Sequence, residues 1–214
     1  MVEMEKLYLE VLETTDGQIL VSHLYQFNRY YELLNKITEE LRKLGHLQTN
    51  IFRNAFENMY IKNQAIIGAS FHLNSEINYD EVEKAINDIW VNDGQNWSDR
   101  IWNDKAKLTE ELREGLIDCL ATGASPDKLT KRIMDSFGVS FHNAQTLART
   151  ELAHIQNAST INKYKKIGIT KVKVLVDTNC CEECTELKNT EFPIDQVPIL
   201  PVHPNCKCTY MAVI

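Results

Sequence analysis

Apolar side chains recur every three or four residues through most of the chain before Gly168, and this spacing predicts amphipathic helices. Residues 20–75 carry the first such pattern, and Gly45 within it predicts a stop or a kink. A short helix is expected at residues 78–90, capped by Asn78 or Asp80. The apolar stripe of the first region comprises Tyr30, Leu33, Leu34, Ile37, Leu41, Leu44, Ile51, Ala55, Met59 and Ile66.

Three further helices are predicted between residues 97 and 168, each opened by a serine cap and closed by a glycine. Pro126 supports the second of these starts, because proline is favoured at the first position of a helix. Each helix also carries an apolar stripe along one face. The expected pairs of cap and closing glycine are Ser98 and Gly123, Ser125 and Gly138, and Ser140 and Gly168.

The period of the pattern changes after the last helix. Val172, Val174 and Val176 alternate with other residues, which predicts a β-strand. The chain beyond them is irregular and rich in proline until residues 208–213, where a final strand is expected.

These patterns predict an α+β fold that is mainly α. Its N-terminal helical region spans residues 1–95, and a second domain spans residues 96–214. The second domain ends in a small β-containing cap, rich in cysteine and histidine, at residues 177–214.

Charge and hydropathy narrow the classes of function. A net charge of -7 argues against a protein that binds nucleic acid over its whole surface. No apolar run approaches the roughly 18 residues needed to cross a membrane, so we expect no membrane partner. The first residues are acidic and do not resemble a secretory signal. We therefore expect the chain to be made in a reducing cell interior, where thiols stay free.

Five of the six cysteines lie close together near the C-terminal end. Cys181 and Cys184 form a C-x2-C pair, whose thiolates can reach one ion from a tight turn. His203, Cys206 and Cys208 follow Cys184 by 19, 22 and 24 residues, a spacing typical of the second pair of ligands in a structural zinc site. The preferred ligands are Cys181, Cys184, His203 and Cys206, with Cys208 as the main substitute for His203.

Other interpretations of these thiols remain open. They would form disulfides if the protein matured outside a reducing cell. Some would be small buried hydrophobic groups, which is also the interpretation for Cys119. A catalytic role is less favoured, because a catalytic zinc keeps an open position whereas this cluster has surplus ligands.

Polar residues also fall on the apolar face of the helix predicted to end at Gly168. Glu151 lies among apolar positions there, with Arg149 on one flank and His154 nearer the other. A buried carboxylate is costly unless it is paired, so we expect Glu151 to meet a backbone amide, the His154 imidazole or a basic side chain. The alternative is a general acid or base in a cleft, for which Asp177 is the obvious companion.

Two helices that flank a short turn with Gly138 could also be mistaken for a DNA-binding helix-turn-helix. The start of the second helix, "SFHNAQTLAR", carries little positive charge. Because phosphate contacts need Lys or Arg, a sequence-reading role is disfavoured.

An ordered set of motifs resembles the phage Mu F-like minor head protein family, also called phage head morphogenesis or minor capsid proteins. The resemblance covers about residues 95–214 well and about residues 25–95 more loosely. Arg149, Glu151 and His154 fall on the family's helix motif, and the Cys/His set falls on its second motif. The extra thiol of Cys180 departs from the pattern. The motifs are "WSDRIWNDKAKL", "GASPDKLTKRIMDSFGVSFHNAQTLARTELAHIQNA", "YKKIG", "DTNCCEEC" and "HPNCKC".

The resemblance implies a non-enzymatic minor protein of the tailed-phage head, from a phage or a prophage. It would assist head assembly at the portal and DNA delivery, with the portal protein and the major capsid or scaffold protein as partners. It would lie inside the phage head, after assembly in the host cytoplasm. Structural zinc would hold the cap together, and contacts with packaged DNA would be weak because the chain is acidic.

Two other functions remain as alternatives. One is a metal-dependent enzyme, a nuclease or a toxin-type transferase, that uses Glu151, His154 and Asp177. The other is a regulatory module with salt-sensitive affinity for short duplex DNA.

Overall fold

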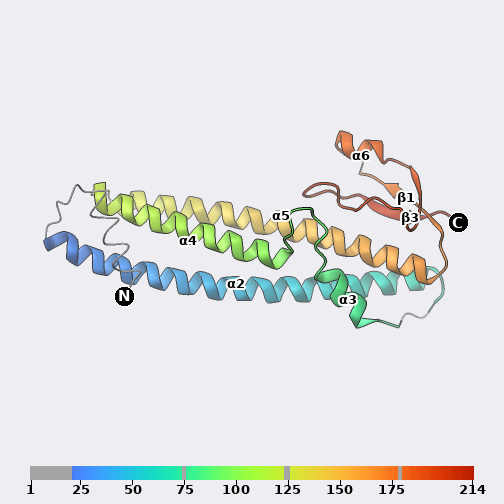
Figure 1. The fold of residues 1–214 in the computed structure, drawn as a ribbon, viewed down its shortest axis with the longest axis horizontal. Helices are drawn as coiled ribbons and strands as arrows, with labels where there is room; N and C mark the ends of the chain where they lie inside the picture. The colour runs from blue at the N-terminus through green and yellow to red at the C-terminus, as the bar shows by residue number, and fades with distance from the viewer. Residues whose placement is uncertain (1–20, 74–75, 123–125, 178–179) are drawn as a thin grey trace. The chain divides into compact units, whose positions relative to one another are not determined.

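The computed structural model describes residues 21–73, 76–122, 126–177 and 180–214. Helices dominate, and one small three-stranded sheet lies near the C-terminus, so the predicted α+β, mainly α fold is confirmed (Figure 1). No helix in the described ranges is both long and apolar enough to cross a membrane. The helices are α2 (Val21–Ser70), α3 (Tyr79–Ile86), α4 (Trp97–Thr122), α5 (Pro126–Lys166) and α6 (Glu182–Glu186), and the strands are β1 (Lys171–Leu175), β2 (Glu191–Pro193) and β3 (Thr209–Ala212).

The chain forms two compact units. The first unit comprises Met1–Gln48 and Arg100–Asn143, and the second comprises Thr49–Asp99 and Ala144–Ile214. The helices α2, α4 and α5 each contribute to both units.

In the first unit, parts of α2, α4 and α5 pack around a small apolar core. Leu41 of α2 and the pair Leu108 and Leu112 of α4 form a buried cluster. Ile37 of α2 and Ile133 of α5 pack against it. The spacing of these residues places each on one face of its helix, as expected for helices that share a core.

The helix α2 continues through Gly45, so the predicted stop at this glycine is wrong. Gly45 is buried against Trp102 of α4, and a Cβ at this position would lie 2.6 Å from Cζ3 of the indole. The absence of a side chain therefore lets the Trp102 ring pack directly on the backbone of α2. The glycine serves a contact between two helices and does not end the first of them.

Replacement of Gly45 by alanine is expected to destabilise the first unit by about 1–3 kcal/mol, the usual cost of an overpacked contact. This is opposite in sign to the gain of roughly 1 kcal/mol that alanine brings to an open helix position. The measurement is urea denaturation followed by far-ultraviolet circular dichroism. Gly138→Ala is the matched control and should stabilise, because Gly138 is an exposed helical glycine and an alanine Cβ there would have no neighbouring atom within 4 Å. A stabilising Gly45→Ala would contradict the packing role.

The helix α5 runs without a break through Gly138 and Ser140, so the two helices predicted here are one. Ser140 is not a helix cap. Its buried hydroxyl donates a hydrogen bond to Asp104 and accepts one from Lys105 Nζ at 3.0 Å. Because no turn interrupts α5, residues 126–166 do not form a helix-turn-helix.

The N-terminus of α4 is capped slightly earlier in the chain than predicted. The cap is Asn96, whose Oδ1 accepts a hydrogen bond from the Asp99 amide at 3.0 Å, and not Ser98. Asp99 Oδ2 in turn accepts from the Asn96 amide at 3.0 Å, which completes a reciprocal capping box.

The predicted cap of α3 is confirmed, because the Asn78 side chain accepts a hydrogen bond from the Asp80 amide at 3.0 Å. The glycine expected to end α5 is also confirmed: the helix ends at Lys166, and Gly168 follows with a left-handed φ of 80°. The predicted caps Gly123 and Ser125, and the side chain of Cys119, lie outside the described residues.

In the second unit, α2 and α5 are joined by buried polar contacts. Ser159 donates from Oγ to the Tyr60 carbonyl at 3.1 Å, and Gln64 donates to the Ser159 carbonyl at 2.8 Å. Asn63 donates to the Gln156 carbonyl at 3.0 Å and to the Thr160 hydroxyl at 2.9 Å. These directional contacts fix the position of α5 along its axis against α2.

The sheet follows α5 in the order β2-β1-β3, with both pairs antiparallel. Val172 and Val174 of the predicted strand β1 are fully buried, whereas Val176 lies beyond its end. β3 confirms the predicted final strand. The short elements β2 and α6 were not predicted, because three and five residues carry too little periodicity to detect.

The thiols belong to the core of this cap. Cys184, Cys206 and Cys208 are buried in the same cluster as Tyr164 of α5 and Tyr210 of β3. The cap therefore packs its cysteines where a larger domain would place aliphatic side chains.

Candidate metal centre

The first pair of thiols is positioned by α6. Cys181 is the N-cap of this helix, and its carbonyl accepts hydrogen bonds from the Thr185 amide and hydroxyl at 3.0 and 2.9 Å. Cys184 lies within the helix, about one turn further on. Residues three apart in a helical turn share a face, so both thiols are presented to the same side. Cys181 is exposed and Cys184 is buried.

The second half of the cluster lies on the segment that connects β2 and β3. The Cys206 amide donates to the His203 carbonyl at 3.1 Å, which closes a tight turn between these two residues. Asn205 within the turn has a left-handed φ of 61°, a conformation that asparagine tolerates better than most residues. The turn thus brings His203 and Cys206 to the same end of the segment.

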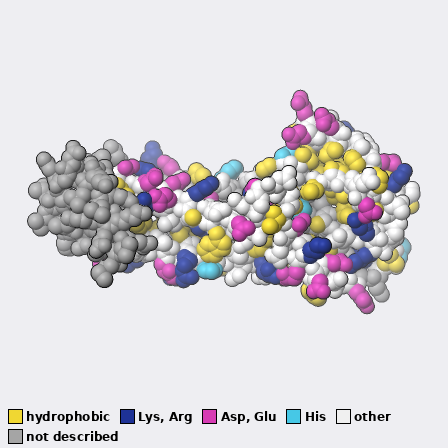
Figure 2. All heavy atoms as spheres, in the orientation of Figure 1, with side chains coloured by type: hydrophobic (Ala, Val, Ile, Leu, Met, Phe, Trp, Pro, Cys, Tyr) yellow, Lys and Arg dark blue, Asp and Glu magenta, His cyan; other side chains and the backbone are white. Residues whose placement is uncertain are grey.

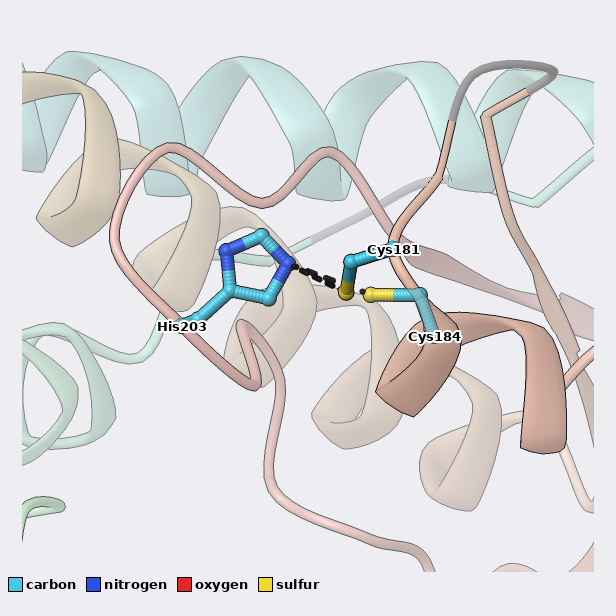
Figure 3. Close-up of side chains that lie close together, drawn as sticks. All are labelled: Cys181, Cys184 and His203. Carbon is cyan, nitrogen blue, oxygen red and sulfur yellow. Dashed lines mark hydrogen bonds between the residues drawn. The ribbon is translucent and has the colours of Figure 1, made fainter.

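The side chains of the two halves meet. His203 Nε2 lies 3.1 Å from Cys181 Sγ and 3.3 Å from Cys184 Sγ, and the imidazole edge points at both sulfurs (Figure 3). Cys184 Sγ lies 3.6 Å from Cys206 Sγ. Tetrahedral zinc with Zn–S bonds of about 2.3 Å holds two sulfurs about 3.8 Å apart. The separation between Cys184 Sγ and Cys206 Sγ is close to the one that such an ion imposes.

Ligand atoms gather in two overlapping groups of three. Cys181, Cys184 and His203 form one group, and Cys184, Cys206 and Cys208 form the other, with all ligand atoms in each group within 4.8 Å of one another. Cys184 belongs to both groups. The first group opens to solvent through Cys181, whereas all three members of the second are buried. The first group offers sulfur and nitrogen donors and the second offers sulfur alone, and zinc binds both kinds of donor. The four predicted ligands, Cys181, Cys184, His203 and Cys206, are divided between the two groups and do not form a single one.

The protonation of His203 suits metal binding. Nδ1 lies 2.9 Å from the Pro204 carbonyl, which can only accept, so Nδ1 carries the proton and donates it. The lone pair of neutral imidazole is then on Nε2, the atom that faces the sulfurs. A metal-ligating histidine commonly donates its other N–H to a backbone carbonyl in this way.

The thiols differ in acidity because their surroundings differ. Burial raises the pKa of Cys184 above its usual range, and burial raises the pKa of Cys208 to about 11. A hydrogen bond from the Cys184 amide lowers the pKa of the exposed Cys181. Without a cation Cys184 and Cys208 are therefore protonated, and a bound cation would convert its ligands to thiolates.

Exposed acidic side chains lie on the helix that carries the first pair of thiols. Glu182, Glu183 and Glu186 are exposed on α6, and Figure 2 shows acidic side chains gathered over this helix. Cys180, the extra thiol, is half-buried, and its Sγ lies 3.3 Å from the Thr185 hydroxyl. The local negative charge favours the approach of a cation.

Glu151 on α5 has the hydrogen-bond donor that a buried carboxylate requires. Its side chain is only 4% exposed, and Oε2 accepts from the indole Nε1 of Trp90 at 3.0 Å. The sequence pattern predicts a donor but not an indole, because Trp90 comes from the segment between α3 and α4 and has no readable spacing relationship with α5.

His154 is buried between the same indole and the cap. Its ring stacks on Trp90 with centroids 4.5 Å apart, and Nδ1 donates to the Leu200 carbonyl at 3.2 Å. Nε2 lies 3.6 Å from Asp88 Oδ2. Burial lowers the pKa of His154, which keeps the ring neutral.

The third residue of the enzymatic alternative has a different environment. Asp177 pairs with Lys207, whose Nζ lies 3.2 Å from Oδ2, and both side chains are exposed or partly exposed. Glu151 and His154 by contrast are buried beneath Trp90, where a substrate would have little access.

Residues 110–211 match the family model described as Phage Mu protein F like protein. This segment is phage Mu F-like. The resemblance drawn from the motifs is therefore confirmed over residues 110–211. The Mu F-like segment contains all of α5, the whole Cys/His cluster and most of the sheet. Searches of the curated proteins and of the solved structures found no match.

Proposed function

We propose that the chain is a minor head protein of a tailed phage or prophage, which assists head assembly at the portal and takes part in DNA delivery. The observation that carries this proposal is the Mu F-like match over residues 110–211. Its partners are the portal protein and the major capsid or scaffold protein, and its contacts with packaged DNA are weak because the chain carries a net charge of -7. It lies inside the mature head after assembly in the host cytoplasm.

The cap of this protein is held together by one structural zinc ion. Its ligands are Cys181, Cys184, His203 and Cys206. Cys184 Sγ supports this set, because it lies close to both His203 Nε2 and Cys206 Sγ and so joins the two groups of ligand atoms. Cys208 is the substitute ligand, because it shares the buried group with Cys184 and Cys206. A sheet whose strands have five, three and four residues buries little apolar surface, so a metal contributes much of its folding free energy.

Co-expression with the portal and major capsid proteins of the same phage genome tests the role in assembly. We expect the chain to co-purify with the portal protein and to be present in assembled heads. Recovery of normal heads and complete absence of the chain from them would contradict the proposal.

The ligand set is tested by two substitutions at the contested position. Cys208→Ser is expected to retain one zinc per chain, whereas His203→Ala should lower the zinc affinity by at least about tenfold, because it removes a direct ligand. Native mass spectrometry gives the stoichiometry, and competition with a chromophoric chelator gives the affinity. The reverse order of effects would make Cys208 the ligand in place of His203.

If the protein is not an enzyme, substitution of Glu151 should change stability and not a catalytic activity. Glu151→Gln should lower the free energy of unfolding by about 1–2 kcal/mol, because the Trp90 hydrogen bond loses its charged acceptor. Neither the wild type nor this variant should cleave single- or double-stranded DNA in the presence of zinc or magnesium. Nuclease activity that is present in the wild type and absent from Glu151→Gln would instead support the enzymatic alternative.

A further inference from the structure

Three buried polar side chains of α5 bind the backbone of the segment that carries His203 and Cys206. Thr150 accepts at Oγ1 from the Asn205 amide at 3.1 Å. His154 donates from Nδ1 to the Leu200 carbonyl at 3.2 Å, and Asn157 donates from Nδ2 to the Cys208 carbonyl at 3.0 Å. We refer to Thr150, His154 and Asn157 as the anchor row.

The anchor row lies on one face of α5 and meets the backbone of a single segment, which turns between His203 and Cys206. Its members stand four and three residues apart, so they project from the same side of α5. Their backbone partners at Leu200, Asn205 and Cys208 lie on both sides of the proposed ligands in sequence. Both the start and the end of the ligand-bearing segment are thereby fixed to a long helix.

The anchor row carries polar atoms that a helix bundle alone would not require. His154 Nε2 and Asn157 Oδ1 are buried and make no hydrogen bond within the described residues; the Asp88 carboxylate lies 3.6 Å from Nε2, beyond hydrogen-bond distance. An unpaired buried acceptor costs free energy, and an apolar side chain at either position would avoid that cost. Each of the two residues offsets this cost with a hydrogen bond that it donates to the backbone of the ligand-bearing segment.

The orientation of His154 is itself fixed from outside the row. The Trp90 indole lies nearly parallel to the imidazole, with an interplanar angle of 11°, and Glu151 holds that indole through its N–H. The ring is therefore held so that Nδ1 faces the Leu200 carbonyl. This gives Glu151 a role in positioning and does not require it to act as an acid or a base.

We propose that Thr150, His154 and Asn157 are positioning residues for the metal centre, which hold His203 and Cys206 in the arrangement that a zinc ion requires before it binds. The inference rests on the zinc site proposed above. A backbone that is already ordered loses less conformational entropy when the ion binds, so the anchor row increases zinc affinity without touching the ion.

The test is the dissociation constant for Zn²⁺, measured on the reduced full chain by competition with a chromophoric chelator. Thr150→Val, which keeps the shape but removes the acceptor, and His154→Leu should each weaken zinc binding by about tenfold, the low end of the effect of residues that orient metal ligands. His154→Asn should restore affinity to within about threefold of the wild type, because its amide places a donor near the position of Nδ1.

Ser159→Ala is the matched control. Ser159 is as deeply buried on α5, but its hydroxyl bonds to Tyr60 of α2 and not to the ligand-bearing segment. This variant should lower the free energy of unfolding and leave the zinc dissociation constant unchanged. A loss of general stability is thus separated from a loss of positioning. Cobalt substitution adds a second readout, since the Co²⁺ absorption spectrum of the Thr150→Val protein should shift as its ligand geometry loosens.

The outcomes separate this inference from the zinc proposal. Wild-type zinc affinity in Thr150→Val and His154→Leu, or an equal loss in Ser159→Ala, would overturn the anchor row and leave the zinc site intact. Failure of the wild-type chain to bind zinc would overturn both.

Discussion

Cys184→Ser is expected to abolish stoichiometric zinc binding and to unfold the cap around β1, β2 and β3. Cys184 is the shared member of both ligand groups and is only 1% exposed, so no neighbouring thiol can take its place without repacking. Structural zinc contributes on the order of 10 kcal/mol to small domains, which exceeds the stability of most of them. Amide hydrogen exchange should show loss of protection in the strands, while α2, α4 and the part of α5 in the first unit stay protected.

Cys180→Ser provides the control for this result. Cys180 is adjacent to the C-x2-C pair but is half-buried and contacts Thr185, so its loss should leave zinc content and exchange protection unchanged. If the cap of Cys184→Ser kept its protection without zinc, the ion would be unnecessary and the apolar cluster alone would account for the fold.

Lys105→Met is expected to lower the free energy of unfolding of the first unit by about 1.5–3 kcal/mol. The partly buried carboxylate of Asp104 loses its charged partner and keeps the donors of Ser140 and Asn143. Lys105 is 6% exposed, and its Nζ contacts Asp104 Oδ2 at 3.1 Å and Ser140 Oγ at 3.0 Å. Methionine fills nearly the same volume, so the loss reports on the charge and not on a cavity. The effect is measured by urea denaturation monitored by circular dichroism.

A second substitution shows whether the loss of stability comes from the unpaired charge of Asp104 or from the missing lysine side chain itself. The double variant Lys105→Met with Asp104→Asn removes both charges, and it should recover at least half of the stability lost in the single variant. If the double variant were as unstable as the sum of the two single variants, the lysine and the aspartate would not act as a pair.

The helices could be predicted from the chain because long apolar stripes have an unambiguous period. The points where a helix ends could not be predicted as well, since a glycine ends a helix only where no tertiary contact keeps the helix continuous. Gly45 lies inside α2 because Trp102 requires a position without a side chain, and Ser140 lies inside α5 because Lys105 and Asp104 bind its hydroxyl. Both causes are contacts across more than 30 residues of sequence, which no local pattern contains.

In the candidate site, too, the features with a local sequence pattern could be predicted and the long-range contacts could not. The C-x2-C pair and the spacing to His203 and Cys206 indicated a metal site, because ligand spacing is local. The role of Trp90 could not be predicted, since the indole reaches Glu151 across 61 residues. The same holds for Thr150 and Asn157, whose partners follow them by 55 and 51 residues. Only the register of α5 against the cap brings these groups together.

Metal content distinguishes a cap held by zinc from one held by its apolar cluster alone. The full chain, purified under reducing conditions, is measured by native and denaturing mass spectrometry together with elemental analysis. One zinc ion per chain in the native spectrum, lost under denaturing conditions, is the predicted result. No bound metal, or a mass lower by two hydrogens for each cysteine pair, would show free thiols or disulfides in the cap and would contradict the zinc proposal.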